Sequence, residues 1–449
     1  MRQRIIDNNN FWSFFVIFGL FFSIEYLLMI NITKVYLLDF RLLLAGFGYF
    51  LFITVIAQQT KYIYKYFYVF IIFSSFIFFI VVLLNPLGNI VFSRGDEYMY
   101  KIYYLNPSLK YRRLTSSLYV LWLKFWAKFI NWHFFKLVNI ASYVISIIIF
   151  YITFKYVYGK TISKLVTIFM LISPLGIWFS NTYYKEAFYI LLLSILMYSI
   201  SKRFLIFSLL ALTLLSFIRT SSVVFIVPLI YYFWKCSRVN HQKGTIITFV
   251  SIMFFIILSF TILHVYYHNI LEVMPKTVIA RGIYYRNFQQ NIYGNLLYFF
   301  LSLILAVLLP LPYLFVSKES IYYLLDYVGY FEGLLTLVMY PYFIVFIVNV
   351  LKLSKFRKQH FLSNESSVFT IMLVIMYIEI YFSIGLSGYI FTYRHYTAYR
   401  WIFYLFASIG KVYFSKNSQK FQKHKLIGTF IILLAIIFVN VYRSFYPRI

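Results

Sequence analysis

Long runs of apolar residues recur along the whole chain and constrain its fold more than any other feature. A run of about 18 or more apolar residues is long enough to cross a bilayer as an α-helix. Some of the runs are shorter, so we expect about 10–13 transmembrane helices, in an all-α polytopic integral membrane protein. The runs begin near Phe11, Leu42, Tyr68, Leu137, Leu165, Ala187, Phe204, Val223, Thr245, Asn295, Leu334, Phe369 and Thr429.

The composition supports this fold class and excludes a water-soluble protein. Of the 449 residues, 63% are hydrophobic and only 12% are charged, whereas a soluble domain carries about twice that charge. Aromatic residues reach 24%, which suits membrane helices whose tyrosines and tryptophans lie at the level of the lipid headgroups. No polar stretch is long enough for a soluble domain, so we predict a single multi-span transmembrane domain over residues 1–449.

Positive charge dominates the chain, with 41 Lys and Arg against 12 Asp and Glu. In a soluble protein this excess would indicate a nucleic acid partner. Here the basic residues cluster in short segments between apolar runs, such as 352–358 and 411–425, as the positive-inside rule predicts for cytoplasmic loops. We therefore expect membrane lipid and no nucleic acid as a partner, and outer loops near residues 85–117, 264–295 and 317–333.

The scarcity of acids makes each of them informative, and Asp96 and Glu97 form the only adjacent pair. They lie in the first large outer loop. A positioned carboxylate is a common general base for activating a hydroxyl group, so we predict that Asp96 and Glu97 are catalytic. The alternative, a solvated pair that caps a helix beginning at Tyr98, stays open at this point.

Cations on the outer face of the membrane run against the general charge trend. Arg112 and Arg113 follow the acid pair, and the planar guanidinium group suits phosphate or diphosphate oxygens. Contact with anionic lipid headgroups is the alternative. Residues 117–134, which follow this loop, place a few polar side chains among aromatic ones, a pattern compatible with an amphipathic helix along the membrane surface.

Further charges interrupt the apolar runs of the second quarter of the chain. Lys185 and Glu186 stand where one apolar run ends and another begins; we take Lys185 as a phosphate ligand and Glu186 as a secondary catalytic candidate, with an ordinary interfacial pair as the alternative. Arg219 separates two short apolar stretches. A charge at membrane depth is unfavourable by about 3 kcal/mol or more, so Arg219 is expected to face a polar cavity or an anion, unless it lies in a short outer loop.

Arginines from distant outer loops complete the predicted site. Cations that converge on one place would stabilise the charge of a diphosphate leaving group, although each of them alone would suit interfacial anchoring. The predicted phosphate or diphosphate ligands are Arg112, Arg113, Lys185, Arg219, Arg281, Arg286 and Arg394.

Several site classes lack support in the sequence. There is no nucleotide-binding glycine loop, no HExxH and no nucleophile elbow. The seven histidines are scattered, and the single cysteine permits no disulfide framework. We therefore predict no metal site and no required cofactor, while a divalent cation would be compatible with a diphosphate substrate.

The chain resembles bacterial membrane proteins of surface-polysaccharide assembly, namely O-antigen or capsule polymerase-like proteins and GT-C type glycosyltransferases. The resemblance rests on GDEYMY at 95–100, SPLGIWFSNTYYKEAF at 173–188 followed by FIRTSS, LPLPYLF followed by FEGLL, and the arginines of FTYRHYTAYR at 391–400. It covers about a quarter of the chain. GT-C enzymes place a catalytic acid in the first large outer loop, and the matching position here is Asp96 or Glu97.

The resemblance implies a GT-C-like helical fold in the bacterial cytoplasmic (inner) membrane and a glycosyltransferase activity. A sugar or oligosaccharide repeat would pass from a polyprenyl-(di)phosphate donor to an acceptor hydroxyl, in a polymerase-like reaction on a glycan acceptor. The alternative function is a transporter or flippase of lipid-linked oligosaccharide. A transporter would place its charges within the membrane, where Glu25 and Glu379 interrupt apolar runs.

Overall fold

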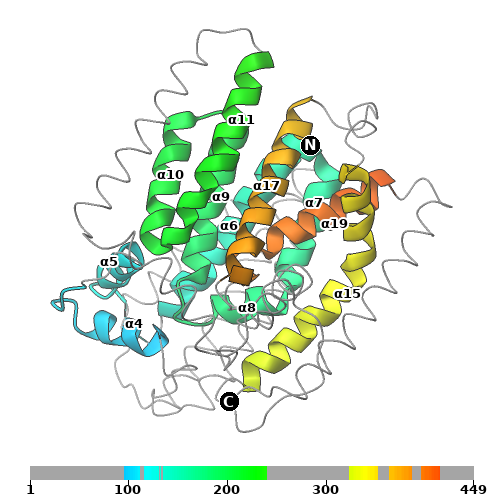
Figure 1. Cartoon of the computed structure of the whole chain (residues 1–449). Coiled ribbons are helices and arrows are strands. Elements are labelled where there is room, and N and C mark those ends of the chain that lie inside the picture. Colours follow the sequence, from blue (N-terminus) through cyan, green and yellow to red (C-terminus); the bar gives the residue numbers. More distant parts are fainter. Residues whose placement is uncertain are drawn as a thin grey trace, which may run out of the picture.

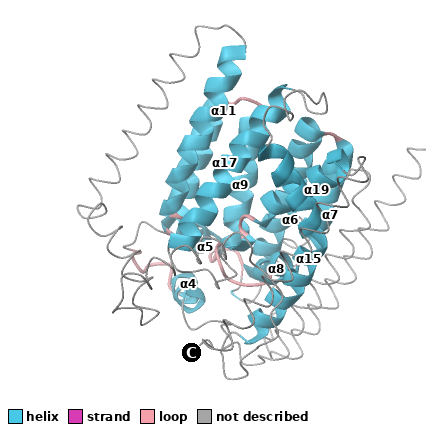
Figure 2. Ribbon diagram, turned by 45° about the vertical axis from the view of Figure 1, so that its right-hand side comes forward, coloured by secondary structure: helices cyan, strands magenta, loops and turns pink. Residues whose placement is uncertain are grey.

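A computed structural model describes residues 96–111, 116–130, 132, 135–239, 323–351, 364–386 and 396–414. Every regular element in these ranges is a helix, which confirms the all-α class for this part of the chain (Figures 1 and 2). The elements are α4 (Asp96–Leu105), α5 (Ser117–Trp126), α6 (Phe135–Tyr158), α7 (Lys160–Ile172), α8 (Pro174–Ser180), α9 (Glu186–Ser201), α10 (Leu205–Ile218), the 3₁₀ helix η2 (Thr220–Phe225), α11 (Ile226–Val239), α15 (Tyr323–Leu351), α17 (Asn364–Leu386) and α19 (Arg400–Phe414).

One helix among the described residues, Val138–Tyr158, is long and apolar enough to cross a membrane. Helices α7 and α8 pass the same test only as a pair, with a bend of 60° between them. The described residues thus hold one or two such helices, fewer than the sequence predicts for the whole chain. The expected runs that begin near residues 11, 42, 68, 245, 295 and 429 lie outside the described residues.

Helix α6 lies at the centre of the described bundle, packed against α7 and α9. It is apolar around most of its circumference, as expected of a helix with neighbours on several sides. Aromatic rings fill the core: the ring of Phe150 in α6 stacks on Trp401 in α19 at 4.5 Å between centroids. Helix α15 runs along α19, and α17 packs against α11 (Figure 1).

A glycine sets the spacing between α15 and α19. A Cβ atom on Gly410 would lie 2.0 Å from the carbonyl oxygen of Tyr342. Only a residue without a side chain permits this approach, as small residues do at other close helix contacts. This close contact lies near the end of α19, and at the start of the same helix Arg400 pairs with Glu332 of α15.

The two ends of the bundle differ in character. At one end the turn between α9 and α10 meets the start of α17 through an ion pair of Arg203 with Glu365, and the Nζ of Lys202 lies 3.5 Å from the ring centroid of Tyr156. At the other end lie α4, α5 and α8 (Figure 1). The basic turns at 160–164 and 202–203 therefore share one end of the bundle.

Two of the predicted outer loops contain helical residues. Residues 323–333 of the loop expected near 317–333 form the first part of α15, because Glu332 is buried and paired inside the bundle and does not interrupt the helix. The loop expected near 85–117 contains α4, and residues 264–295 lie outside the described part of the chain. The apolar runs do not predict α19 as a separate element, because Arg394 lies shortly before it and Arg400 is its first residue.

Candidate functional site

Two glutamates in the described helices, Glu186 and Glu332, are fully buried, and each pairs with a buried arginine. Removing both ions of such a pair from water is unfavourable unless further hydrogen bonds satisfy them. The number of hydrogen bonds around each carboxylate therefore distinguishes a structural pair from one with capacity for a ligand. We call Glu332 with Arg400 the filled pair, and Glu186 with Arg219 the open pair.

In the filled pair both carboxylate oxygens of Glu332 are satisfied. The Oε1 atom accepts hydrogen bonds from Nε of Arg400 at 3.1 Å and from the hydroxyl of Tyr404. The Oε2 atom accepts from Oγ of Ser173 at 2.8 Å and from the backbone N–H of Leu175 at 3.3 Å. Four donors around one carboxylate leave no position for a ligand, so this pair has a structural role.

The filled pair fixes the break between α7 and α8. Pro174 cannot continue a helix from α7 because it lacks an N–H. Ser173 instead caps α8, and its Oγ accepts a hydrogen bond from the backbone N–H of Gly176 at 3.1 Å. The hydroxyl of Ser173 points its own hydrogen at Glu332, so α15 and α19 together hold the bend.

The open pair is less complete. The Oε1 atom of Glu186 accepts a hydrogen bond from a terminal guanidinium nitrogen of Arg219 at 2.6 Å. Its Oε2 atom has no hydrogen-bond partner among the described residues, although it is buried. The guanidinium of Arg219 lies 4.9 Å from the ring centroid of Tyr189, which supports the cation from one face. One carboxylate oxygen thus retains its full capacity to accept a proton or a hydrogen bond.

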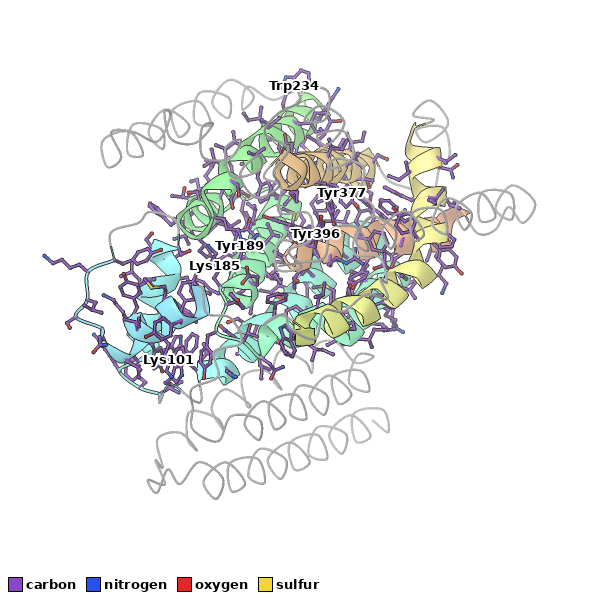
Figure 3. All side chains as sticks on the ribbon, turned by 60° about the horizontal axis from the view of Figure 1, so that its bottom comes forward. Lys101, Lys185, Tyr189, Trp234, Tyr377 and Tyr396 are labelled. Carbon is purple, nitrogen blue, oxygen red and sulfur yellow. The ribbon has the colours of Figure 1, made fainter. Side chains whose placement is uncertain are left out.

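Lys185 lies beside the open pair and is also buried. Its Nζ donates to Oγ of Ser116 at 2.6 Å and to the carbonyl oxygen of Ile218 at 3.0 Å. Ile218 is the last residue of α10, and a cation at a helix C-terminus interacts favourably with the helix dipole. Lys185 and Tyr189 lie near α4 and α5, at the same end of the bundle (Figure 3).

The segment that carries Lys185 and Glu186 is held from two sides. The hydroxyl of Tyr119 in α5 donates to the carbonyl oxygen of Tyr183 at 2.7 Å. The side-chain amide of Asn139 in α6 donates to the carbonyl oxygen of Thr182 at 2.6 Å. These bonds replace the helical partners that residues between α8 and α9 lack, so the backbone before Glu186 is fixed in position.

Two tyrosines, Tyr189 and Tyr399, lie between the open pair and the filled pair. The hydroxyl of Tyr189 lies 2.8 Å from Oγ of Ser222 and 2.8 Å from the hydroxyl of Tyr399. Tyr399 immediately precedes Arg400. The two ion pairs are therefore separated by one tyrosine contact and one peptide bond.

The structure brings together three of the predicted site residues, Lys185, Glu186 and Arg219. Asp96 and Glu97 begin α4, one helical turn before Tyr100, whose hydroxyl donates to Oγ of Ser116 at 3.2 Å. The side chains of Asp96 and Glu97 lie outside the described part. The predicted phosphate ligands that also lie outside it are Arg112, Arg113, Arg281, Arg286 and Arg394.

The sequence predicts no pairing of Glu332 with Arg400. A signal was present, because Glu332 starts an apolar stretch within a long helix and a charge in that setting needs a partner. The partner lies 68 residues further along the chain, and nothing local indicates it. Among the described residues no group of three or more His, Cys, Asp or Glu is placed to hold a metal ion.

The chain matches no protein-family model, no curated protein and no solved structure. The chemistry of the site is therefore the observation that bears on function. A buried carboxylate with one unengaged oxygen can take a proton from a hydroxyl group, and a guanidinium and an ammonium group beside it can stabilise negative charge on a phosphate.

Proposed function

We propose that the chain is a multi-pass protein of the bacterial cytoplasmic membrane and a glycosyltransferase of surface-polysaccharide assembly. It transfers a sugar or an oligosaccharide repeat from a polyprenyl-(di)phosphate donor to an acceptor hydroxyl, in a polymerase-like reaction. The observation that carries the proposal is the unengaged Oε2 atom of Glu186. Its partners in the reaction are the lipid-linked glycosyl donor and the glycan acceptor.

A buried acceptor without a partner is unfavourable by about 1–3 kcal/mol. Such groups are rare, and each needs an explanation. The filled pair demonstrates that this fold can surround a buried glutamate with donors. The missing donor at Glu186 is accounted for if the acceptor hydroxyl of the substrate supplies it.

In the proposed step the acceptor oxygen forms a bond to the anomeric carbon while the bond from that carbon to the phosphate oxygen breaks. The hydroxyl proton moves to Oε2 of Glu186. The polyprenyl (di)phosphate leaves with the electron pair, and Arg219 and Lys185 stabilise its charge. No cofactor is required, and a divalent cation would be compatible with the diphosphate.

The other predicted residues take part from the outer loops. Asp96 and Glu97, at the start of α4, are proposed as further carboxylates that bind or deprotonate the glycan acceptor. Cations outside the described residues would complete the diphosphate site: Arg112, Arg113, Arg281, Arg286 and Arg394.

The test compares Glu186→Gln with Glu365→Gln in the native host. Glu365 is exposed and lies at the other end of the bundle, so its variant is the matched control. Loss of a general base lowers the rate by about 10²–10⁴-fold, so surface glycan should disappear in Glu186→Gln at normal membrane abundance. An unchanged glycan ladder in Glu186→Gln would reject the proposed role. Asp96→Asn and Glu97→Gln, made in parallel, report whether the acid pair contributes.

A transporter of lipid-linked oligosaccharide is the second candidate, and Glu379 favours it. This residue lies within the 23-residue helix α17, and its Oε2 has no hydrogen-bond partner among the described residues. A transport defect would leave lipid-linked repeats on the cytoplasmic face, whereas a transfer defect would leave them on the outer face. Lectin labelling of intact spheroplasts of Glu186→Gln and Glu379→Gln distinguishes the two.

A further inference from the structure

Helix α5 and the turn that follows it present an exposed apolar face. Leu121, Phe125 and Phe129, spaced four residues apart, have exposed fractions of 63%, 50% and 54%. The opposite face of the helix is buried in the bundle through Tyr119, Val120 and Leu123. Large apolar side chains at this spacing on a partly polar helix are typical of helices that lie in a membrane interface.

All charged residues in the sequence around this exposed face are positive. Lys124 and Lys128 lie between the exposed apolar residues. Between residues 98 and 135 the chain has six basic residues and no acidic one. A surface that combines apolar anchors with lysines and lacks acids complements a layer of anionic lipid headgroups. The six basic residues are Lys101, Lys110, Arg112, Arg113, Lys124 and Lys128.

Helix α5 is also tied to the open pair. The ring of Trp122 stacks on Phe188 of α9 at 4.7 Å between centroids, two residues beyond Glu186. Ser116, directly before the helix, accepts the hydrogen bond from Lys185. A shift of α5 relative to the bundle would therefore move the partner of Lys185.

The segment after α5 is tied to α4. The hydroxyl of Tyr104 donates to the carbonyl oxygen of Ile130 at 2.5 Å. Burial raises the pKa of the Tyr104 hydroxyl above its ordinary value. Helices α4 and α5 thus form one unit beside the open pair (Figure 3).

We propose that the exposed face of α5 binds the anionic phospholipid surface of the membrane and thereby holds Lys185 and Glu186 at the level of the lipid phosphates. The proposal rests on the membrane location given under the proposed function, but not on the transferase activity. A second copy of the chain is a poorer occupant, because pairing this face with itself would bring like charges together.

The test measures the depth of α5 in the bilayer with the full-length chain. Cys236 is the single cysteine, so a Cys236→Ser background allows one environment-sensitive fluorophore at Phe125→Cys. The protein is placed in nanodiscs of phosphatidylcholine alone or with added phosphatidylglycerol. We expect a blue-shifted emission and quenching by headgroup-level nitroxide lipids, both increased by phosphatidylglycerol.

Two controls sharpen the result. Replacing Lys124 and Lys128 with glutamine should remove the dependence on phosphatidylglycerol, whereas replacing both with arginine should retain it. A fluorophore at Ser108→Cys, an exposed polar position after α4, should be quenched less than the one at Phe125→Cys.

Three outcomes would overturn the proposal. Emission typical of water without quenching means that the face does not bind lipid. Equal quenching in neutral and anionic discs removes the selectivity for anionic lipid, and a blue shift without nitroxide quenching assigns the face to a protein partner. None of these measurements needs glycan synthesis, so failure of the transferase assignment and failure of this proposal are separate results.

Discussion

Glu332 and Glu186 are both fully buried and both bind an arginine, yet the Glu332 carboxylate has four hydrogen-bond donors, whereas the Glu186 carboxylate has one among the described residues, Arg219. Glu332 lies within the long helix α15, and its donors come from α19 and from the start of α8. Glu186 lies at the start of α9, and Arg219 lies between α10 and η2 in an extended conformation (φ −138°, ψ 112°). The filled pair thus joins α15 to α19 and α8, whereas the two residues of the open pair lie at the ends of helices.

The difference teaches that a buried ion pair is not evidence of function by itself. Burial and an arginine partner are common to both sites, and only the satisfaction of the second carboxylate oxygen separates them. The same substitution, glutamate to glutamine, should therefore lower stability by different amounts at the two positions.

The largest expected effect is that of Glu332→Gln. All contacts of this carboxylate are donors, so whichever way the amide turns, its NH₂ group faces a guanidinium or backbone N–H. Breaking a buried pair in this way lowers stability by about 3–5 kcal/mol. The apparent melting temperature in detergent and the membrane abundance measure the loss. Glu365→Gln, in an exposed pair, should change stability by about 1 kcal/mol or less; equal effects of the two variants would contradict the assignment of the filled pair.

The next effect is that of Gly410→Ala, which tests the close contact between α19 and α15, the two helices that also carry Arg400 and Glu332. The new Cβ would meet the carbonyl oxygen of Tyr342 at 2.0 Å, so α19 has to move away from α15. Overpacking of this kind lowers stability by about 1–3 kcal/mol. Thermal unfolding of the purified protein checks this, with Lys411→Arg on the exposed neighbouring residue as control. A melting temperature equal to that of the control would argue against the close contact.

Glu186→Gln should lower stability by about 1–3 kcal/mol, less than Glu332→Gln, because it leaves the buried Arg219 beside a neutral amide but breaks no other hydrogen bond of the carboxylate among the described residues. Its amide oxygen can still accept from Arg219, and its NH₂ group takes the position of the unengaged oxygen. Thermal unfolding of Glu186→Gln and Glu332→Gln under identical conditions compares the pairs directly. A loss at Glu186 as large as that at Glu332 would mean that the second oxygen has a structural partner.

The smallest effect is expected for Tyr189→Phe, which keeps the ring beneath Arg219 and removes the hydroxyl between Ser222 and Tyr399. The loss of one buried hydrogen-bonding group changes stability by about 0.5–1.5 kcal/mol. A double-mutant cycle with Tyr399→Phe measures the interaction between the two hydroxyls. Additive effects of the two substitutions would show that the ion pairs are not linked through these tyrosines.

Part of the site follows from the sequence. Lys185, Glu186 and Arg219 interrupt apolar runs, and because a charge among apolar residues needs a partner or an anion, each of them was singled out. The helices of the described residues also follow from local pattern: apolar runs bounded by polar turns predict α6, α9 and α10 near their observed starts. Residues 117–126 of the stretch expected at the membrane surface form α5, in which Leu121 and Phe125 are exposed.

Sequence alone determined the all-helical class of the described residues and the charges that had to be accommodated within it. The tertiary structure alone decided that Arg219 reaches Glu186, that Arg400 reaches Glu332 across 68 residues, and that one carboxylate oxygen is left unengaged. The physical reason is that helix formation depends on neighbours three or four residues away, whereas the pairing of buried charges depends on which helices approach each other. At Gly410 that approach is set by the absence of a side chain, and at Ser173 by a bend between two helices, and both act between segments far apart in the chain.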